Sequence, residues 1–255
     1  MNRIIYILSV LLFSSVTISF AQTVNIESKR MQSDSIRFVF RGDFGGKYND
    51  NNGKYILQIK SSIATQVKSK GLNTIYFLVA NQDRIKTMDD DFNNSWFLHL
   101  RANHEITNLF RLEAFVQNQN NKLLDMKNRF LVGAGVRLKL VSTDFMRLYM
   151  GNSYMYEIEQ SNSVEKIFYN HRNSTYLSFS VSLFNNTVEA ISTTYFQPLY
   201  SDFSNYNLLE QLKVDVSISK TISLFSLFDY SYSFFTPTQR RQYYALMNVG
   251  VGLKL

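Results

Sequence analysis

The sequence contains no cysteine, which excludes disulfide bonds and thiolate metal sites. It has only two prolines, Pro198 and Pro237, and no low-complexity linker, so we expect a single folded domain. After the first 21 residues, no apolar run is long enough to cross a membrane as a helix. The mean hydropathy is slightly polar although the chain holds 16 tyrosines and 21 phenylalanines. Its apolar residues are therefore spread along the chain and not gathered in blocks.

The first residues have the features of a secretory signal peptide. Arg3 supplies a positive start, Ile4–Phe13 form an apolar run, and the small residues Ser19 and Ala21 occupy the positions that a signal peptidase reads. We expect cleavage between Ala21 and Gln22. A permanent membrane anchor is the less favoured alternative, because the apolar run is short and polar serines interrupt it.

From Ile36 to Leu255 the dominant pattern is alternation with a period of two, which is typical of strands with two different faces. The last segment shows it clearly. One face carries apolar side chains at Tyr243, Ala245, Met247, Val249, Val251, Leu253 and Leu255. The other face carries Tyr244, Leu246, Asn248, Gly250, Gly252 and Lys254. Residues 127–141 and 108–120 repeat the pattern.

Counting such segments predicts about twelve strands. They lie near residues 35–46, 54–67, 72–84, 93–106, 108–120, 127–141, 144–158, 171–184, 187–198, 206–219, 221–235 and 241–255. The predicted organisation is a signal peptide at 1–21, a short periplasmic segment at 22–34 and an outer membrane β-barrel at 35–255.

The connections between these segments alternate in length. Short polar turns are expected at Lys68–Gly71, Thr107-Asn108, Ser142-Thr143, Asn185-Asn186 and Ser219–Thr221. Longer connections are expected at Asn49–Gly53, Lys86–Asp91, Asn121–Asp125, Gln160–Asn170, Leu199–Asn205 and Thr236–Arg240. Outer membrane barrels have tight periplasmic turns and longer external loops, and an even strand count leaves both termini on the periplasmic side.

Alternation alone does not separate a membrane barrel from a soluble one, but two features favour the membrane. The polar face of the clearest strands holds small residues such as Gly133, Gly135 and Gly250, which suit a crowded interior better than a water-facing exterior. Aromatic residues also gather near strand ends, as the interfacial girdles of membrane barrels do. They are Tyr232, Phe234 and Tyr243 toward the long loops, and Phe110 and Phe184 toward the short turns. The fold class we predict is all-β, a closed antiparallel up-and-down transmembrane β-barrel.

The segments Arg111–Asn120 and Arg129–Leu140 carry a resemblance to a known family. They read Arg-Leu-Glu-Ala-Phe-Val-Gln from Arg111, and Arg-Phe-Leu-Val-Gly-Ala-Gly-Val-Arg from Arg129. Together with Tyr195–Pro198 they resemble the domain-of-unknown-function family of salt-induced outer membrane proteins, over roughly Ser35 to Leu255. The resemblance implies an outer membrane location and a barrel. It supplies no catalytic residues.

Three histidines are the natural place to look for catalysis. His99 falls on the predicted inner face, His104 on the opposite face, and His171 opens a strand with Ser174 close by. An outer-leaflet lipid hydrolase would need a histidine hydrogen-bonded to a serine, but residues three apart on a strand point to opposite faces. We therefore expect no enzyme activity and keep the lipid hydrolase as an alternative, with His171 as its base.

Other ligand classes have weak support. No glycine-rich phosphate loop leads into a helix, which argues against nucleotide binding, and we expect no cofactor. The acidic run Asp89–Asp91 could hold a divalent cation, but such runs are more often solvated loop tips. Nucleic acid is not expected as a partner in this compartment, despite the formal net charge of +7.

The predicted inner face carries most of the strand charges. The candidate lumen-lining residues are Arg101, Arg111, Glu113, Arg129, Arg137, Lys139 and Arg147. Further charges of the same parity are Arg37, Arg41, Asp43, Lys60, Glu105, Lys213, Asp215 and Asp229. One interpretation is a network of ion pairs that fills a narrow lumen. The other is a basic track that conducts acidic solutes.

The sequence thus predicts an outer membrane barrel that is either structural or a narrow channel with a basic lumen. The expected partners are outer membrane lipids, the barrel assembly machinery and small anionic solutes. The alternatives are the lipid hydrolase and a secreted soluble β-barrel that binds a ligand.

Overall fold

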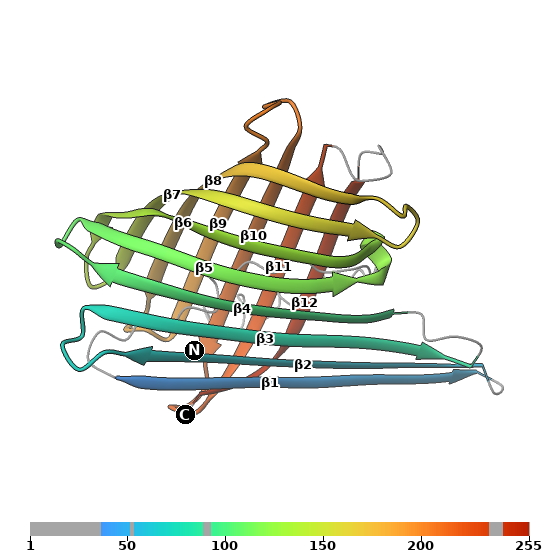
Figure 1. The fold of residues 1–255 in the computed structure, drawn as a ribbon. Coiled ribbons are helices and arrows are strands. Elements are labelled where there is room, and N and C mark those ends of the chain that lie inside the picture. The colour runs from blue at the N-terminus through green and yellow to red at the C-terminus, as the bar shows by residue number, and fades with distance from the viewer. Residues whose placement is uncertain (1–36, 52–53, 89–92, 235–241, 255) are drawn as a thin grey trace.

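A computed structural model describes residues 37–51, 54–88, 93–234 and 242–254. Twelve strands fill this part of the chain (Figure 1). Their bounds are β1 Phe38–Asn51, β2 Lys54–Lys68, β3 Thr74–Thr87, β4 Asn93–Glu105, β5 Phe110–Asn121, β6 Met126–Ser142, β7 Met146–Ser161, β8 Ile167–Leu183, β9 Val188–Pro198, β10 Tyr206–Ser217, β11 Ile222–Ser233 and β12 Gln242–Lys254. A 3-10 helix, η2, covers Lys122–Leu124 between β5 and β6.

Each strand pairs antiparallel with its neighbours in sequence, and β1 meets β12 to close the barrel. The start of β1 and the end of β12 lie at the same end of the barrel, because Arg41 pairs with Lys254. We call this the terminal end. The predicted up-and-down barrel of twelve strands is confirmed.

Burial alternates along the strands, with apolar side chains outward and polar side chains inward, as a barrel in a membrane requires. In β4, the side chains of His99 and Arg101 are 1% and 6% exposed, whereas Leu98 and Leu100 between them are 46% and 47% exposed. The apolar side chains therefore face outward and the polar ones face the lumen. A soluble barrel has the opposite arrangement.

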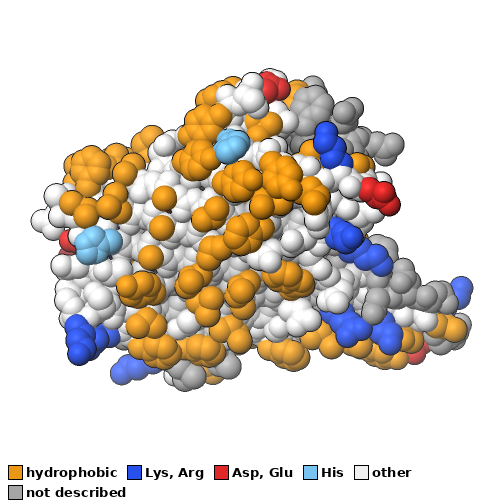
Figure 2. Space-filling view, viewed as in Figure 1, with side chains coloured by type: hydrophobic (Ala, Val, Ile, Leu, Met, Phe, Trp, Pro, Cys, Tyr) orange, Lys and Arg blue, Asp and Glu red, His pale blue; other side chains and the backbone are white. Residues whose placement is uncertain are grey.

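The outer wall presents a belt of hydrophobic side chains, with lysine and arginine toward its two ends (Figure 2). The exposed apolar residues on strands include Ile63, Leu112, Val132, Leu177 and Leu212. A closed barrel satisfies its backbone groups between strands, so this surface can contact hydrocarbon. The protein is an outer membrane β-barrel, and lipid is the environment of its wall. In the described residues, no helix has the length and apolar character to cross a membrane.

Two features of the connections differ from the sequence prediction. The long connection expected at Asn49–Gly53 is wrong, because β1 continues to Asn51 and β2 begins at Lys54. The strand expected at 171–184 begins already at Ile167. In β1, polar residues continue the ladder of backbone hydrogen bonds beyond the apolar belt, where alternation of hydrophobicity ends. β8 instead begins with Ile167, Phe168 and Tyr169, which pair with the last residues of β7.

Some predictions lie outside the described residues. These are the signal peptide and its cleavage site, the periplasmic segment at 22–34, and the acidic run Asp89–Asp91. Among the girdle residues, Phe110, Phe184 and Tyr243 are exposed by 46%, 60% and 77%.

Candidate functional site: the barrel lumen

The lumen is lined mainly by polar and charged side chains. Of the seven candidate lumen residues, Arg101, Glu113, Arg129 and Arg137 are buried inside the barrel. Arg111, Lys139 and Arg147 are half-buried nearer the terminal end. Asp229 is also buried and accepts a hydrogen bond from Gln211. Burial inside a closed barrel places these groups away from both lipid and bulk water, so each needs a partner.

Glu113 on β5 is the centre of the first charged cluster. Its carboxylate lies 3.7 Å from Nη1 of Arg101 and 3.6 Å from Nη1 of Arg137. It also accepts hydrogen bonds from Nδ2 of Asn103 at 2.6 Å and from the hydroxyl of Tyr176 at 2.7 Å. We call these five residues the Glu113 network. It joins β4, β5, β6 and β8 and fixes the side chains on that side of the lumen.

Glycines on β6 and β7 make room for two aromatic rings, that of Tyr176 in this network and that of Phe115 beside it. Gly133 lies opposite Phe115, and a Cβ atom there would overlap the Phe115 ring. Gly151 lies opposite Tyr176 and likewise leaves space for the tyrosine ring. The guanidinium of Arg101 lies 5.5 Å from the centre of the Phe115 ring. The small residues seen in the sequence therefore serve the packing of a crowded interior.

Glu157 on β7 is the centre of a second cluster, nearer the opposite end of the barrel. Nε of Arg129 lies 3.1 Å from its carboxylate, and Nε of Arg172 lies 3.3 Å away on the other oxygen. Asn170 donates a hydrogen bond to Glu157 at 2.8 Å, and Glu159 lies 4.0 Å from Nε of Arg129. We call these five residues the Glu157 network. A cavity of about 40 Å³ lies between the two networks.

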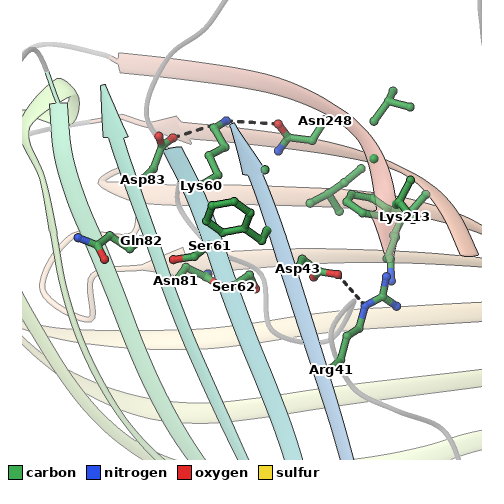
Figure 3. Close-up of a pocket in the computed structure, with 17 residues that line it drawn as sticks. Arg41, Asp43, Lys60, Ser61, Ser62, Asn81, Gln82, Asp83, Lys213 and Asn248 are labelled. Carbon is green, nitrogen blue, oxygen red and sulfur yellow. Dashed lines mark hydrogen bonds and ion pairs between the residues drawn. The ribbon is translucent and has the colours of Figure 1, made fainter. Parts of the chain in front are cut away.

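A larger cavity of about 180 Å³ occupies the lumen beside β1–β3 and β10–β12. Its charged lining comprises Arg41, Lys60 and Lys213 together with Asp43 and Asp83 (Figure 3). Nε of Arg41 lies 3.2 Å from the Asp43 carboxylate, and Nζ of Lys60 lies 3.5 Å from that of Asp83. We call this space the seam cavity because it lies where β1 and β12 meet.

One further carboxylate connects two of these cations. Asp215 on β10 lies 3.2 Å from Nη1 of Arg41 and 3.1 Å from Nζ of Lys213. The ion pair between Arg41 and Asp215 links the first strand to the tenth across the seam. Ion pairs on this side of the lumen therefore join strands from the beginning of the chain to strands near its end.

The sequence prediction missed four members of these clusters. Glu157, Glu159 and Arg172 were not among the expected lumen charges, and neither was Asp83. Their parity could have identified them: Glu157 lies two residues from Met155 and four from Ser153, which are both buried in the lumen.

The three histidines lie in separate places. His99 is buried, and its Nδ1 lies 3.0 Å from Oε1 of Gln117. His104 contacts the hydroxyl of Thr74 at 2.8 Å on the exposed wall. His171 is exposed and hydrogen-bonded to Tyr154, whereas Ser174 is buried in the lumen, where it accepts a hydrogen bond from Gln197. His171 and Ser174 are therefore on opposite faces of the wall.

Comparison with known families and structures gives the setting of this lumen. A family model described as a protein of unknown function, DUF481, matches residues 19–253. This confirms the resemblance to a domain-of-unknown-function family, and the description carries no reference to salt. No curated protein matches the sequence.

Among solved structures, the NanC porin has a TM-score of 0.50 with 10% identity, covering 86% of this chain and 100% of that one. A bacterial polysaccharide outer membrane secretin has a TM-score of 0.47 with 8% identity, covering 84% and 79%. The translocator domain of the autotransporter NalP from Neisseria meningitidis has a TM-score of 0.46 with 14% identity, covering 86% and 87%. At such low identity, the likeness to the NanC porin shows the fold alone.

Proposed function

Because the chain belongs to the DUF481 family of proteins of unknown function, its role must be argued from its lumen, and we propose that it is a narrow channel for small polar solutes with a weak preference for anions. The observation that carries this proposal is the seam cavity, a space of about 180 Å³ with Arg41, Lys60 and Lys213 in its lining. The Glu113 and Glu157 networks occupy the other side of the lumen. They restrict any path through the barrel to the side lined by β1–β3 and β10–β12.

The weak preference for anions comes from an excess of cationic over anionic side chains in the lumen. Arg101 and Arg137 share Glu113 alone, so cations are in excess in that network. In the Glu157 network, Arg129 and Arg172 face two carboxylates, Glu157 and Glu159. Lys139 and Arg147 add positive charge near the terminal end. The four arginines of the two networks are paired with carboxylates, so the lumen differs from an unpaired basic track, and we expect modest selectivity.

A structural barrel with a filled lumen is the second candidate. The same two networks favour it, because they join side chains from neighbouring and more distant strands with direct hydrogen bonds. Paired charges of this kind can fill a narrow lumen completely. The two candidates differ in whether water and ions pass the seam cavity.

Conductance of the purified protein in planar lipid bilayers tests the proposal. A steady current of low conductance, larger for anions than for cations, is expected of the narrow channel. Silence over many insertions, with insertion verified by protease protection of the same protein in vesicles, would instead favour the filled barrel and overturn the channel.

Two further expectations belong to the proposal. Assembly by the barrel assembly machinery is expected of any outer membrane β-barrel, and depletion of that machinery should leave the protein unfolded in the periplasm. The resemblance to salt-induced proteins predicts more protein at high osmotic strength, which an immunoblot of outer membranes from cells grown at low and high salt would measure.

A further inference from the structure

The seam between β1 and β12 closes over a short distance. Among the described residues these strands pair at two positions, Arg41 with Lys254 and Gly42 with Leu253. By contrast, β11 pairs with β12 from Ile222 to Ser233, along its whole length. Figure 1 shows β1 and β12 meeting near the terminal end and diverging from there. Beyond Gly42, the described parts of the two strands no longer form a common ladder.

Three outward-facing side chains beside the seam are more exposed than several that lie between paired strands. Phe44 on β1 is 79% exposed, and Val249 and Val251 on β12 are 66% and 55% exposed. On strands with partners on both sides, Val132 and Leu212 are each 43% exposed. If β1 and β12 paired along their whole length, each strand would cover part of the other's side chains and lower their exposed fractions.

The seam cavity reaches this opening. Its lining includes Arg41 and Lys60, which face the lumen, and also Phe44, Val249 and Val251, which face outward. In the described residues, β1 and β12 do not pair at these three positions, so the cavity lies beside a gap in the wall. Through this gap, the charged groups inside are close to the hydrocarbon side.

Lys60 is the cation best placed to receive a ligand there. Its side chain is 31% exposed, compared with 15% for Arg41 and 11% for Lys213. Nζ of Lys60 donates a hydrogen bond to Asn248 on β12 at 3.3 Å and lies 3.5 Å from Asp83 on β3 (Figure 3). It thus has partners on both sides of the opening.

We propose that the seam is a membrane-facing entry through which the carboxylate head of a single-chain amphiphile reaches Lys60, while its hydrocarbon chain contacts Phe44, Val249 and Val251. Asp43 and Asp215 contact Arg41, and Asp215 also contacts Lys213, so these two cations are closely paired. Lys60 faces only Asp83, at 3.5 Å, and is therefore the cation that a carboxylate head can join. A volume of about 180 Å³ corresponds to roughly six water molecules, which suits a carboxylate with its first methylene groups. The remainder of the chain stays in the lipid. This inference uses the same cavity as the proposed channel but does not require that the cavity conduct ions.

Photolabelling in nanodiscs of phosphatidylcholine tests the site. The probe is a palmitic acid analogue with a diazirine beside the carboxylate, and labelled peptides are identified by mass spectrometry. We expect labels on the segments of β1, β2 and β12 that line the cavity. The Lys60→Ala variant should reduce this labelling about tenfold, because a charge-assisted hydrogen bond is lost. Lys127→Ala, which removes an exposed cation on β6, should leave it unchanged. Equal labelling of wild type and Lys60→Ala, or labels confined to other parts of the wall, would overturn the proposal.

Two further arms determine the route. The absence of cysteine allows a single disulfide between Phe44→Cys and Val251→Cys, the pair expected if the register beyond Gly42 and Leu253 continued. In the oxidised double variant, palmitate labelling should fall about tenfold and should return on reduction. Because the same protein is compared in both states, a recovery of labelling shows that the loss was not caused by misfolding. A butyrate analogue with the same diazirine should label poorly in both states, because it lacks the chain that holds the probe in the membrane. Strong butyrate labelling that persists after oxidation would show entry from water and overturn the membrane route.

Discussion

The carboxylate of Glu113 and the guanidinium of Arg137 lie 3.6 Å apart on adjacent strands, and each side chain is 1% exposed. Arg137 also donates a hydrogen bond at 3.0 Å to the hydroxyl of Tyr176, which itself donates to Glu113. The three groups form a closed set in which every member orients the other two. A pair this deeply buried is stable only while both charges are present.

Glu113→Gln should therefore destabilise the barrel although it preserves the shape of the side chain. The change leaves Arg101 and Arg137 buried without their shared negative charge, and we expect a loss of about 3 kcal/mol or more in the free energy of unfolding. Urea unfolding of the protein in lipid vesicles, followed by tryptophan fluorescence, measures it.

Glu105→Gln is the matched control for this variant. Glu105 forms an ion pair with Arg111, but its side chain is 29% exposed. Partial exposure screens the pair, so we expect a loss of about 1 kcal/mol or less. Equal losses in the two variants would show that burial of the Glu113 network does not determine its energy.

Gly135→Ala should destabilise the wall through close packing. A Cβ atom at Gly135 would overlap the backbone carbonyl of Asn152 on β7, and backbone in a sheet cannot move aside as a flexible side chain can. We expect a loss of about 1–3 kcal/mol, measured by the same urea unfolding. Gly45→Ala is the control, because a Cβ there meets nothing within 4 Å and should leave the unfolding midpoint unchanged. Tolerance of alanine at both positions would contradict the packing described for β6 and β7.

Charge reversal at the terminal end should change ion selectivity if the lumen conducts. Lys139 and Arg147 are half-buried on β6 and β7, and the double substitution to glutamate replaces two positive charges with two negative ones. We expect the reversal potential in a potassium chloride gradient to shift from anion-selective toward cation-selective. Lys127→Glu, at the other end of β6, should produce a smaller shift. No shift in the double variant would remove the basis for the anion preference.

The sequence predicted the number of strands and the face of most side chains because both follow from a period of two. Leu98 and Leu100 alternate with His99 and Arg101 in the sequence, and the structure exposes the first two and buries the others. The pattern needs no knowledge of tertiary contacts, since adjacent side chains on a strand always point to opposite faces.

What the sequence could not supply is the height of each residue along the barrel axis. Glu113 contacts Tyr176, which is 63 residues away, because the offsets between successive strands bring them to one level. Those offsets accumulate from strand to strand and leave no mark in the alternation. The short seam between β1 and β12 was equally hidden, because both strands alternate as regularly as their neighbours.

The lipid hydrolase alternative predicts activity that depends on His171. The structure places His171 on the exposed wall and Ser174 in the lumen, so a hydrogen bond between them would require the strand to turn over. We expect wild type, His171→Ala and Ser174→Ala to be equally inactive toward phospholipids with a fluorescent acyl chain in mixed micelles. Hydrolysis by the wild type that disappears in His171→Ala would overturn this expectation and establish an enzyme.

The orientation of the whole wall can be tested with the single tryptophan of the chain, Trp96. Trp96 lies on the outward parity of β4, is 37% exposed and is the fourth residue of that strand, counted from the end opposite the termini. This position is close to the membrane interface, where the indole ring is favoured. Bromine attached to shallow carbons of the phospholipid chains should therefore quench its fluorescence more strongly than bromine near the bilayer centre. Aqueous acrylamide should quench it less than it quenches the unfolded protein. Strong quenching by acrylamide with none by brominated lipid would place Trp96 in water, and the apolar belt could then not be the surface that contacts hydrocarbon.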